Sequence, residues 1–178
     1  MKRLLLLTTG FLLALTSARA AEPIQVTVVG KSTGDIAGSA KDGSIEGLAM
    51  EHEIITPRDA SSGLPTGRRQ HKPLTIVKPI DKASPLLMKL LANNESATVT
   101  LKFTRPDPNG GGKPQQYYTI KLTNAAVSSI REWKPNTRDV SADRAGDLEE
   151  ISFIYQKIEW TWTEGGVTFE DSWSSSAT

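Results

Sequence analysis

Few side chains in this sequence have the types and spacing that chemistry requires. The chain has no cysteine, which excludes a thiol nucleophile, a disulfide and a zinc ribbon. Its two histidines are His52 and His71, and His52 lies between Glu51 and Glu53. Because successive residues of a strand face opposite sides, at most two members of this Glu-His-Glu triplet can converge on one metal ion. We interpret the triplet as a solvated strand face and predict no metal site.

Two further motifs give no support for catalysis. The sequence has no G-x-S-x-G elbow, so a hydrolase serine has no recognisable setting. The run Gly110-Gly111-Gly112-Lys113 resembles a phosphate-binding loop, but its spacing is wrong, and Pro114 stands where Ser or Thr would hold magnesium. We interpret this run as the tip of a hairpin. The residues alone therefore predict a protein that is not an enzyme.

The composition is that of one folded domain. The 178 residues are 38% apolar, which is too much for a disordered chain and too little for a polytopic membrane protein. The 21 basic and 20 acidic side chains leave a formal charge of +1, so the charge balance indicates neither nucleic acid nor an acidic membrane as a partner.

The first twenty residues have the order of a secretory signal. A basic start, Met1-Lys2-Arg3, precedes an apolar run at 4–15, and Ala18-Arg19-Ala20 offers small residues to a signal peptidase. We predict cleavage before Ala21, so that residues 1–20 are removed and 21–178 form one domain outside the cytoplasm, periplasmic or secreted, with no membrane contact. A membrane anchor or a misplaced start codon is the alternative.

The remaining pattern is mostly that of strands. Alternation or extended composition predicts strands at 24–28, 44–55, 73–78, 99–103, 118–130, 148–163 and 167–173. One short helix is expected from Ser84, which could cap it, through Pro85 to the stop signal Asn93-Asn94. Within 148–163 the apolar parity changes, which predicts a bulge near Gln156-Lys157 or a strand covered on both faces. Many strands with short turns favour a closed or nearly closed antiparallel barrel.

The segment between the second and third strands is the most distinctive. Residues 56–70 are too many for a simple connection in a compact domain, and loops of this length are usually functional or disordered. The stretch from Thr56-Pro57-Arg58-Asp59 to Arg68-Arg69-Gln70-His71-Lys72-Pro73 closely resembles the Hcp family (haemolysin-coregulated protein), the tube protein of type VI secretion systems. The resemblance continues at Asp81-Lys82-Ala83-Ser84-Pro85, at 117–125 and at 151–162, in family order and spacing.

This resemblance implies a fold and a role. The fold is two antiparallel sheets forming a closed β-barrel with one short α-helix on the side. The role is structural: hexameric rings of identical subunits stack into a tube that can carry secreted effectors and meets a spike protein, without catalysis or cofactor. The resemblance also implies that the long loop contacts the neighbouring ring. The predicted contact residues are Arg58, Asp59, Ser61, Ser62, Gly63, Leu64, Pro65, Thr66, Gly67, Arg68 and Arg69.

One departure from the family pattern keeps other functions open. Family members usually lack a Sec signal, because the contractile machine exports them from the cytoplasm. This chain could therefore be a periplasmic or secreted Hcp-like binding module that takes no part in contractile injection. Three tryptophans, Trp133, Trp162 and Trp173, motivate that alternative, since aromatic side chains often hold ligands. A periplasmic hydrolase is a third possibility, against which the missing motifs count.

Overall fold

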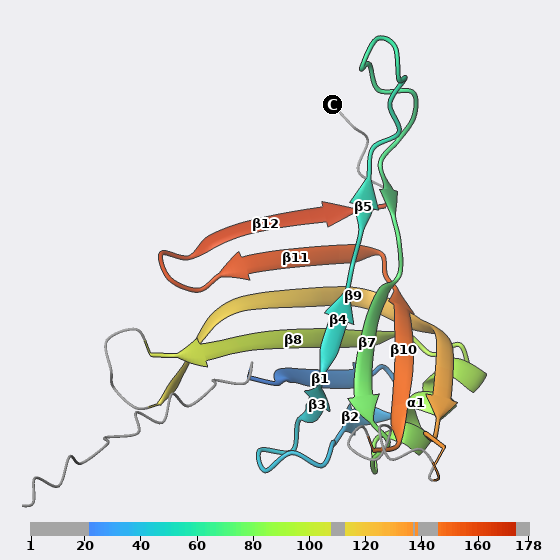
Figure 1. Cartoon of the computed structure of the whole chain (residues 1–178), viewed down its shortest axis with the longest axis vertical. Helices are drawn as coiled ribbons and strands as arrows, with labels where there is room; N and C mark the ends of the chain where they lie inside the picture. Colours follow the sequence, from blue (N-terminus) through green and yellow to red (C-terminus); the bar gives the residue numbers. More distant parts are fainter. Residues whose placement is uncertain (1–21, 108–112, 137, 139–145, 174–178) are drawn as a thin grey trace, which may run out of the picture.

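The computed structural model describes residues 22–107, 113–136, 138 and 146–173, and strands dominate them (Figure 1). The elements are β1 (Ile24–Gly30), β2 (Gly34–Ile36), β3 (Ile45–Gly47), β4 (Ala49–Glu51), β5 (Ile54–Ile55), β6 (Gln70–His71), β7 (Leu74–Pro79), α1 (Ser84–Ala92), β8 (Ala97–Pro106), β9 (Pro114–Trp133), β10 (Leu148–Ile154), β11 (Lys157–Trp162) and β12 (Val167–Ser172). Within these residues, the prediction of antiparallel strands with one short helix is confirmed.

The long strand β9 joins two antiparallel sheets. Its first part pairs with β8 on one side and β11 on the other, whereas its last part pairs with β10. The first sheet runs β2–β1–β8–β9–β11–β12, with β3 also paired to β1, and the second runs β9–β10–β7–β4. Figure 1 shows the strands of the first sheet crossing those of the second at a steep angle.

The two sheets do not close into a barrel, so the predicted closed β-barrel is wrong. A closed barrel needs its two outermost strands to pair with each other. Here β12 pairs with β11 alone and β4 pairs with β7 alone, among the strands that the structure describes. The sequence could not reveal this, because an open sheet and a closed sheet have the same two-residue alternation along each strand.

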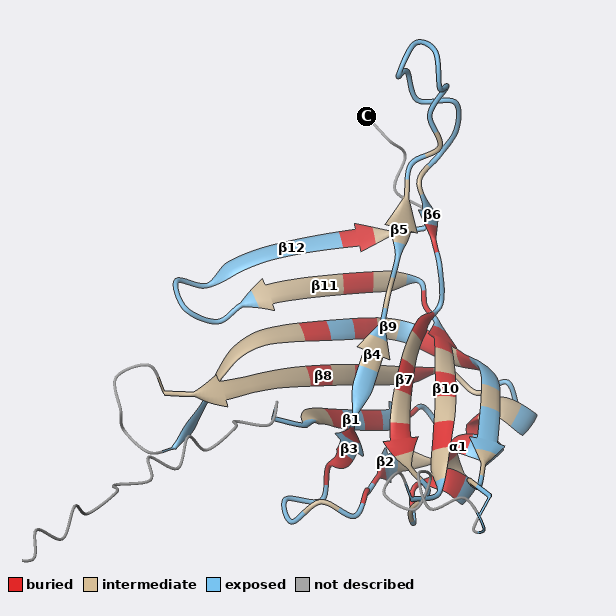
Figure 2. Cartoon of the chain, in the orientation of Figure 1, coloured by how far each residue is buried: buried red, intermediate tan, exposed pale blue. Residues whose placement is uncertain are grey.

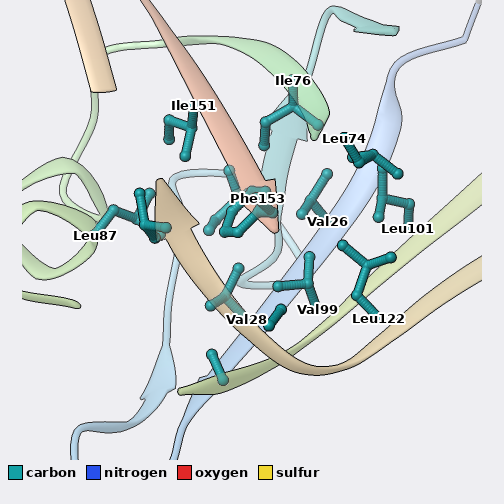
Figure 3. Close-up of a cluster of buried hydrophobic side chains, with 14 of the residues drawn as sticks. Val26, Val28, Leu74, Ile76, Leu87, Val99, Leu101, Leu122, Ile151 and Phe153 are labelled. Atoms are coloured by element: carbon teal, nitrogen blue, oxygen red, sulfur yellow. The ribbon is translucent and has the colours of Figure 1, made fainter. Parts of the chain in front are cut away.

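The apolar core lies where β1, β7, β8 and β10 meet α1 (Figures 2 and 3). The side chains of Val26, Leu101, Ile76 and Phe153 are fully buried there. The β12 strand and the loop between β5 and β6 are largely exposed, whereas β11 is mostly half-buried and contributes Ile158 to the core (Figure 2). The core therefore stabilises the body, while two projections remain available for contacts.

The helix α1 ends as the sequence predicts, but its N-terminus is not capped by the predicted residue. Pro85 occupies the first turn, and Asn94 ends the helix with φ = 49°, as predicted for a residue that tolerates the left-handed conformation. The predicted cap by Ser84 is wrong. The Ser84 hydroxyl donates instead to Glu149 (2.7 Å), and the Asp81 carboxylate accepts the Ala83 amide (2.9 Å). Ser84 is the first residue inside the helix and Ala83 takes the N-cap position, so the serine hydroxyl accepts the Asp81 amide (3.0 Å) rather than an amide of the first helical turn.

Two predicted strands are divided because the chain changes sheet within them. The segment 44–55 becomes β3, β4 and β5, and the change from one sheet to the other occurs at Leu48, whose amide donates to the Val77 carbonyl (2.8 Å). The segment 148–163 is interrupted at Tyr155 and Gln156, and its two parts pair with different parts of β9. The parity change therefore marks this passage between sheets.

Candidate assembly surfaces

The loop between β5 and β6 is an ordered hairpin that projects from the body (Figure 1). Arg58 and Pro65 form an isolated antiparallel bridge, and the Thr66 amide donates to the Pro57 carbonyl (2.9 Å). Nearer the tip, the Asp59 amide donates to the Leu64 carbonyl (2.9 Å). These hydrogen bonds give the segment a defined shape, so the alternative of a disordered surface loop is not supported.

The Asp59 carboxylate organises the loop tip. Its Oδ1 accepts hydrogen bonds from the hydroxyl and amide of Ser61 (2.6 and 3.1 Å) and from the amide and hydroxyl of Ser62 (both 2.8 Å). The Ser61 hydroxyl, followed by the Ser62 amide, holds the pKa of Asp59 well below its usual range. Four donors on one carboxylate fix the turn without tertiary support, which is the usual role of aspartate in a tight turn.

We predict that Asp59→Ala loosens the tip and leaves the body unchanged. The Ser61 and Ser62 amides lose their acceptor, so their hydrogen exchange should accelerate about tenfold, as measured by NMR. The turn requires the charged carboxylate, and the pKa of Asp59 in the folded loop is lower than that of an ordinary aspartate. The turn therefore keeps its stability at pH values above the ordinary aspartate pKa and loses it only as pH falls through the lowered pKa of Asp59. It should persist near pH 4. Asp59→Asn keeps one acceptor oxygen and should give an intermediate rate. Equal exchange in the wild type and Asp59→Ala would contradict this role.

The predicted contact residues of the loop are exposed with one exception. Leu64, 66% exposed, presents an apolar side chain at the tip, while Arg58 and Arg68 present positive charge beside it. The exception is Arg69, which turns toward the body and pairs with Asp171 at the end of β12. The structure thus brings ten predicted contact residues to one projection and assigns the eleventh to its base.

The outer strand β12 is a second exposed surface. Its Val167 and Phe169 side chains are 68% and 66% exposed, and the Phe169 ring stacks on Trp160 of β11 with centroids 5.8 Å apart. Because β12 pairs only with β11 among the described strands, its other backbone edge is open. An open edge with apolar side chains is a template for pairing with another chain.

Two of the tryptophans that motivated a binding module, Trp162 and Trp173, lie on or next to this hairpin, whereas Trp133 lies at the far end of β9, opposite Leu148 of β10. Trp162 and Trp173 are 38% and 55% exposed, while Trp133 at the end of β9 is half-buried. Trp162 contacts Tyr117, and the Arg105 guanidinium lies over both rings, 5.5 and 5.2 Å from their centroids. The three indoles therefore do not converge on one ligand site.

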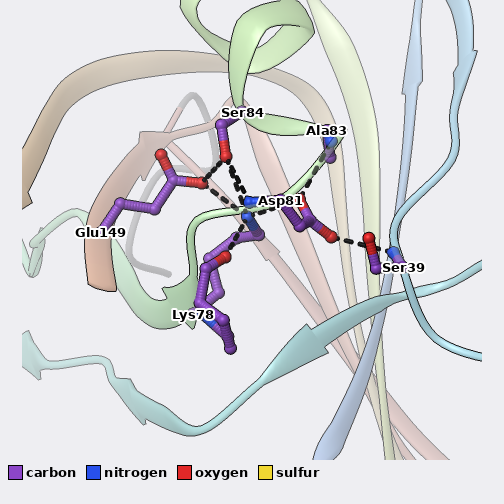
Figure 4. Close-up of polar contacts among 7 residues, drawn as sticks. Ser39, Lys78, Asp81, Ala83, Ser84 and Glu149 are labelled. Carbon is purple, nitrogen blue, oxygen red and sulfur yellow. Dashed lines mark hydrogen bonds and ion pairs between the residues drawn. The ribbon is translucent and has the colours of Figure 1, made fainter. Parts of the chain in front are cut away.

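A buried polar cluster joins α1 to β7 and β10 of the second sheet and to the segment between β2 and β3 (Figure 4). The Lys78 ammonium donates to Glu149 (2.5 Å) and Asp81 (2.8 Å), and neither Lys78 nor Glu149 is exposed. Asp81 also accepts the Ser39 amide (2.9 Å) from the segment between β2 and β3. Because these charges are sealed from solvent, the cluster serves to hold elements together.

The remaining predictions concern a metal site, a membrane span and the signal-peptide cleavage site. In the part of the chain that the structure describes, His, Asp and Glu side chains form no group of three that could hold a metal ion, and no helix there has the length and apolarity to cross a bilayer. His71 is buried at the end of β6. The predicted cleavage residues Ala18, Ala20 and Ala21 and the run at 110–112 lie outside the described residues.

Comparison with known proteins identifies the family. The family model described as "Type VI secretion system effector, Hcp" matches residues 24–162, which is most of the chain; the match includes the loop between β5 and β6 and ends with β11. This chain belongs to the Hcp family. The match confirms the family resemblance seen in the sequence and extends it over residues 24–162. The role of the chain is that of an Hcp-like structural tube component of the type VI secretion system.

Individual relatives agree with this assignment. The "Major exported protein" of Pseudomonas aeruginosa is 39% identical over 127 residues, covering 71% of this chain and 73% of its own. A crystal structure of an Hcp protein is 27% identical and superposes with a TM-score of 0.79 over 88% of this chain and 100% of its own. An Hcp1 variant from E. coli EAEC 042 is 30% identical, with a TM-score of 0.74 over 86% of this chain and 99% of its own. Hcp membership supports self-association and secretion of this chain.

Proposed function

We propose that residues 21–178 assemble into hexameric rings, that the rings stack into a tube, and that the loop hairpin of each copy contacts the next ring. The observation that carries this proposal is the ordered hairpin with an apolar tip, which nothing in its own body covers. Leu64 is two-thirds exposed, although its carbonyl accepts the Asp59 amide and the Gly63 amide donates to the Asp59 carbonyl. A rigid projection of this kind loses little conformational entropy on binding.

The open sheet supports ring formation. The first sheet ends in β12 on one side and in β2 and β3 on the other, and these edges differ in length and composition. Contacts between two different edges are heterologous, and heterologous contacts close into rings when the rotation between copies is suitable. A sheet that remains open in one copy can therefore be completed by its neighbours.

Export and further partners belong to the same proposal. Residues 1–20 would act as a Sec signal, which places the mature protein in the periplasm or outside the cell. Effector proteins in the lumen and a spike protein at the end of the tube are proposed on the family resemblance alone. Because a Sec signal bypasses loading from the cytoplasm, a periplasmic or secreted Hcp-like module outside contractile injection is the competing function.

Electron microscopy and light scattering of the exported protein test the proposal. We expect annular particles with six times the mass of the mature chain, stacks of these rings at high concentration, and an N-terminus at Ala21. A monomer at every concentration, without annular particles, would overturn the tube. A monomer that also binds sugars or peptides would favour the binding module.

A further inference from the structure

The base of the loop hairpin is too small to fix the direction of the loop. Strands β5 and β6 pair through two residues each, Ile54 with His71 and Ile55 with Gln70. Two-stranded ribbons are marginally stable on their own, and a ribbon of two residue pairs contributes less still. The projecting hairpin therefore depends on side chains that connect its base to the body.

Asp171 supplies this connection from the end of β12. Its two carboxylate oxygens accept hydrogen bonds from Nε and Nη2 of Arg69, both at 2.5 Å. The Asp171 side chain is 6% exposed and that of Arg69 is 30% exposed, so the pair is shielded on its acidic side. A bidentate contact between guanidinium and carboxylate fixes orientation as well as distance.

Buried aromatic and imidazole groups extend the connection to the other side of the loop base. Nε2 of His71 lies 3.2 Å from Asp171 Oδ2, and its Nδ1 lies 3.0 Å from the Tyr155 hydroxyl. The same hydroxyl lies 2.6 Å from Nε2 of His52, which precedes β5. Burial raises the pKa of Tyr155 and lowers that of His52, so both groups stay neutral in this network.

We propose that Asp171 is a positioning residue for the loop, and that the β11–β12 hairpin sets the direction in which the loop leaves the body. This inference rests on the proposed function, since the loop direction matters only if the loop meets another copy. The carboxylate lies on the open outer strand, within two residues of the exposed Phe169. A neighbour that pairs with β12 therefore steadies the loop through one side chain, which couples ring closure to stacking.

The absence of cysteine allows a direct test by site-specific spin labelling. Cysteines at Ala60 and Thr163, both exposed, place one label on the loop tip and one on the β11–β12 turn, and labelled chains are diluted with unlabelled ones. Asp171→Asn should widen the distance distribution about twofold, because the loop samples more directions. Arg69→Lys, which keeps the charge and loses the bidentate contact, should widen it less, and Asp171→Glu should restore part of the order.

A matched control lies on the same loop base. Lys72 and Glu53 form a pair at 2.8 Å whose side chains are 52% and 50% exposed, so Lys72→Gln removes a cation without touching Asp171. Lys72→Gln should leave the loop-tip distance distribution unchanged. A second label pair, at Lys89 on α1 and Thr163 on the β11–β12 turn, should give the same distances in the wild type and in Asp171→Asn. Tube length by electron microscopy should fall for Asp171→Asn and not for Lys72→Gln.

The outcomes separate this inference from the proposed function. A distribution that stays narrow in Asp171→Asn and Arg69→Lys, or that widens equally in Lys72→Gln, overturns the positioning role even if tubes form. Widening confined to the Asp171 and Arg69 variants supports it. If the wild type forms neither rings nor tubes, the proposed function fails, whereas the spin-label distances still decide what holds the loop.

Discussion

Removing residues 61–67 should leave the body folded and abolish stacked tubes while single rings persist. The deleted segment contains the exposed Leu64 and the Ser61 and Ser62 turn, and none of it belongs to the apolar core. The deletion also removes Thr66, whose amide donates to the Pro57 carbonyl, so residues 58–60 must close the shortened loop above the β5–β6 pairs, which remain. Because each ring would meet the next through several copies of the same contact, a loss of about 1.4 kcal/mol at each one lowers stacking affinity far more than tenfold.

The measurement is the fraction of rings found in stacks by electron microscopy, with urea unfolding as the check on the fold. Leu64→Ser is the smaller companion variant, because it removes the apolar tip and keeps the hydrogen-bonded turn. Leu64→Ser should also shorten the stacks, but less than the deletion does. Stacks of normal length in the deletion variant would show that ring–ring contacts lie elsewhere. Loss of the rings themselves would show that the loop acts within the ring.

Local sequence signals predicted the elements of this fold well. The α1 helix follows from its proline and its terminal asparagines, which act within one or two turns. The strands follow from alternation, which reports one buried face. Closure of the sheet, in contrast, depends on whether β12 meets a distant strand, and no residue within β12 encodes that choice. The predicted barrel failed for this reason, whereas the length of the loop between β5 and β6 was visible directly.

In the candidate site, too, local features were predicted from the sequence and contacts between distant residues were not. The exposed loop residues were predicted from a continuous segment and a family resemblance. Arg69 was grouped with them because it lies in the same segment, yet its partner Asp171 is 102 positions away. Tyr155 likewise joins His52 and His71 across 103 and 84 positions. Pairings at such separations arise from the packing of β10, β11 and β12, and one sequence without aligned relatives carries no signal for them.

Lys78→Met should be among the most destabilising single substitutions in the body. It removes one partner of a fully buried ion pair and leaves Glu149 without its cation, in contact with the Ser84 hydroxyl alone. Breaking such a pair costs about 3–5 kcal/mol, which is a large part of the total stability of an ordinary domain. The double variant Lys78→Met with Glu149→Leu should recover most of this loss, because it leaves no buried charge from the pair.

An exposed ion pair provides the control, and urea unfolding at neutral pH provides the measurement. Lys157→Met breaks a pair with Glu170 at 3.1 Å whose side chains are 39% and 59% exposed, so it should change stability by no more than about 1 kcal/mol. Similar losses in Lys78→Met and Lys157→Met would contradict the role of the buried cluster. Since Asp81 in that cluster also holds Ser39, loss of Lys78 should loosen the segment between β2 and β3 as well. The same buried charges therefore determine both the stability of the body and the order of one edge of the open sheet.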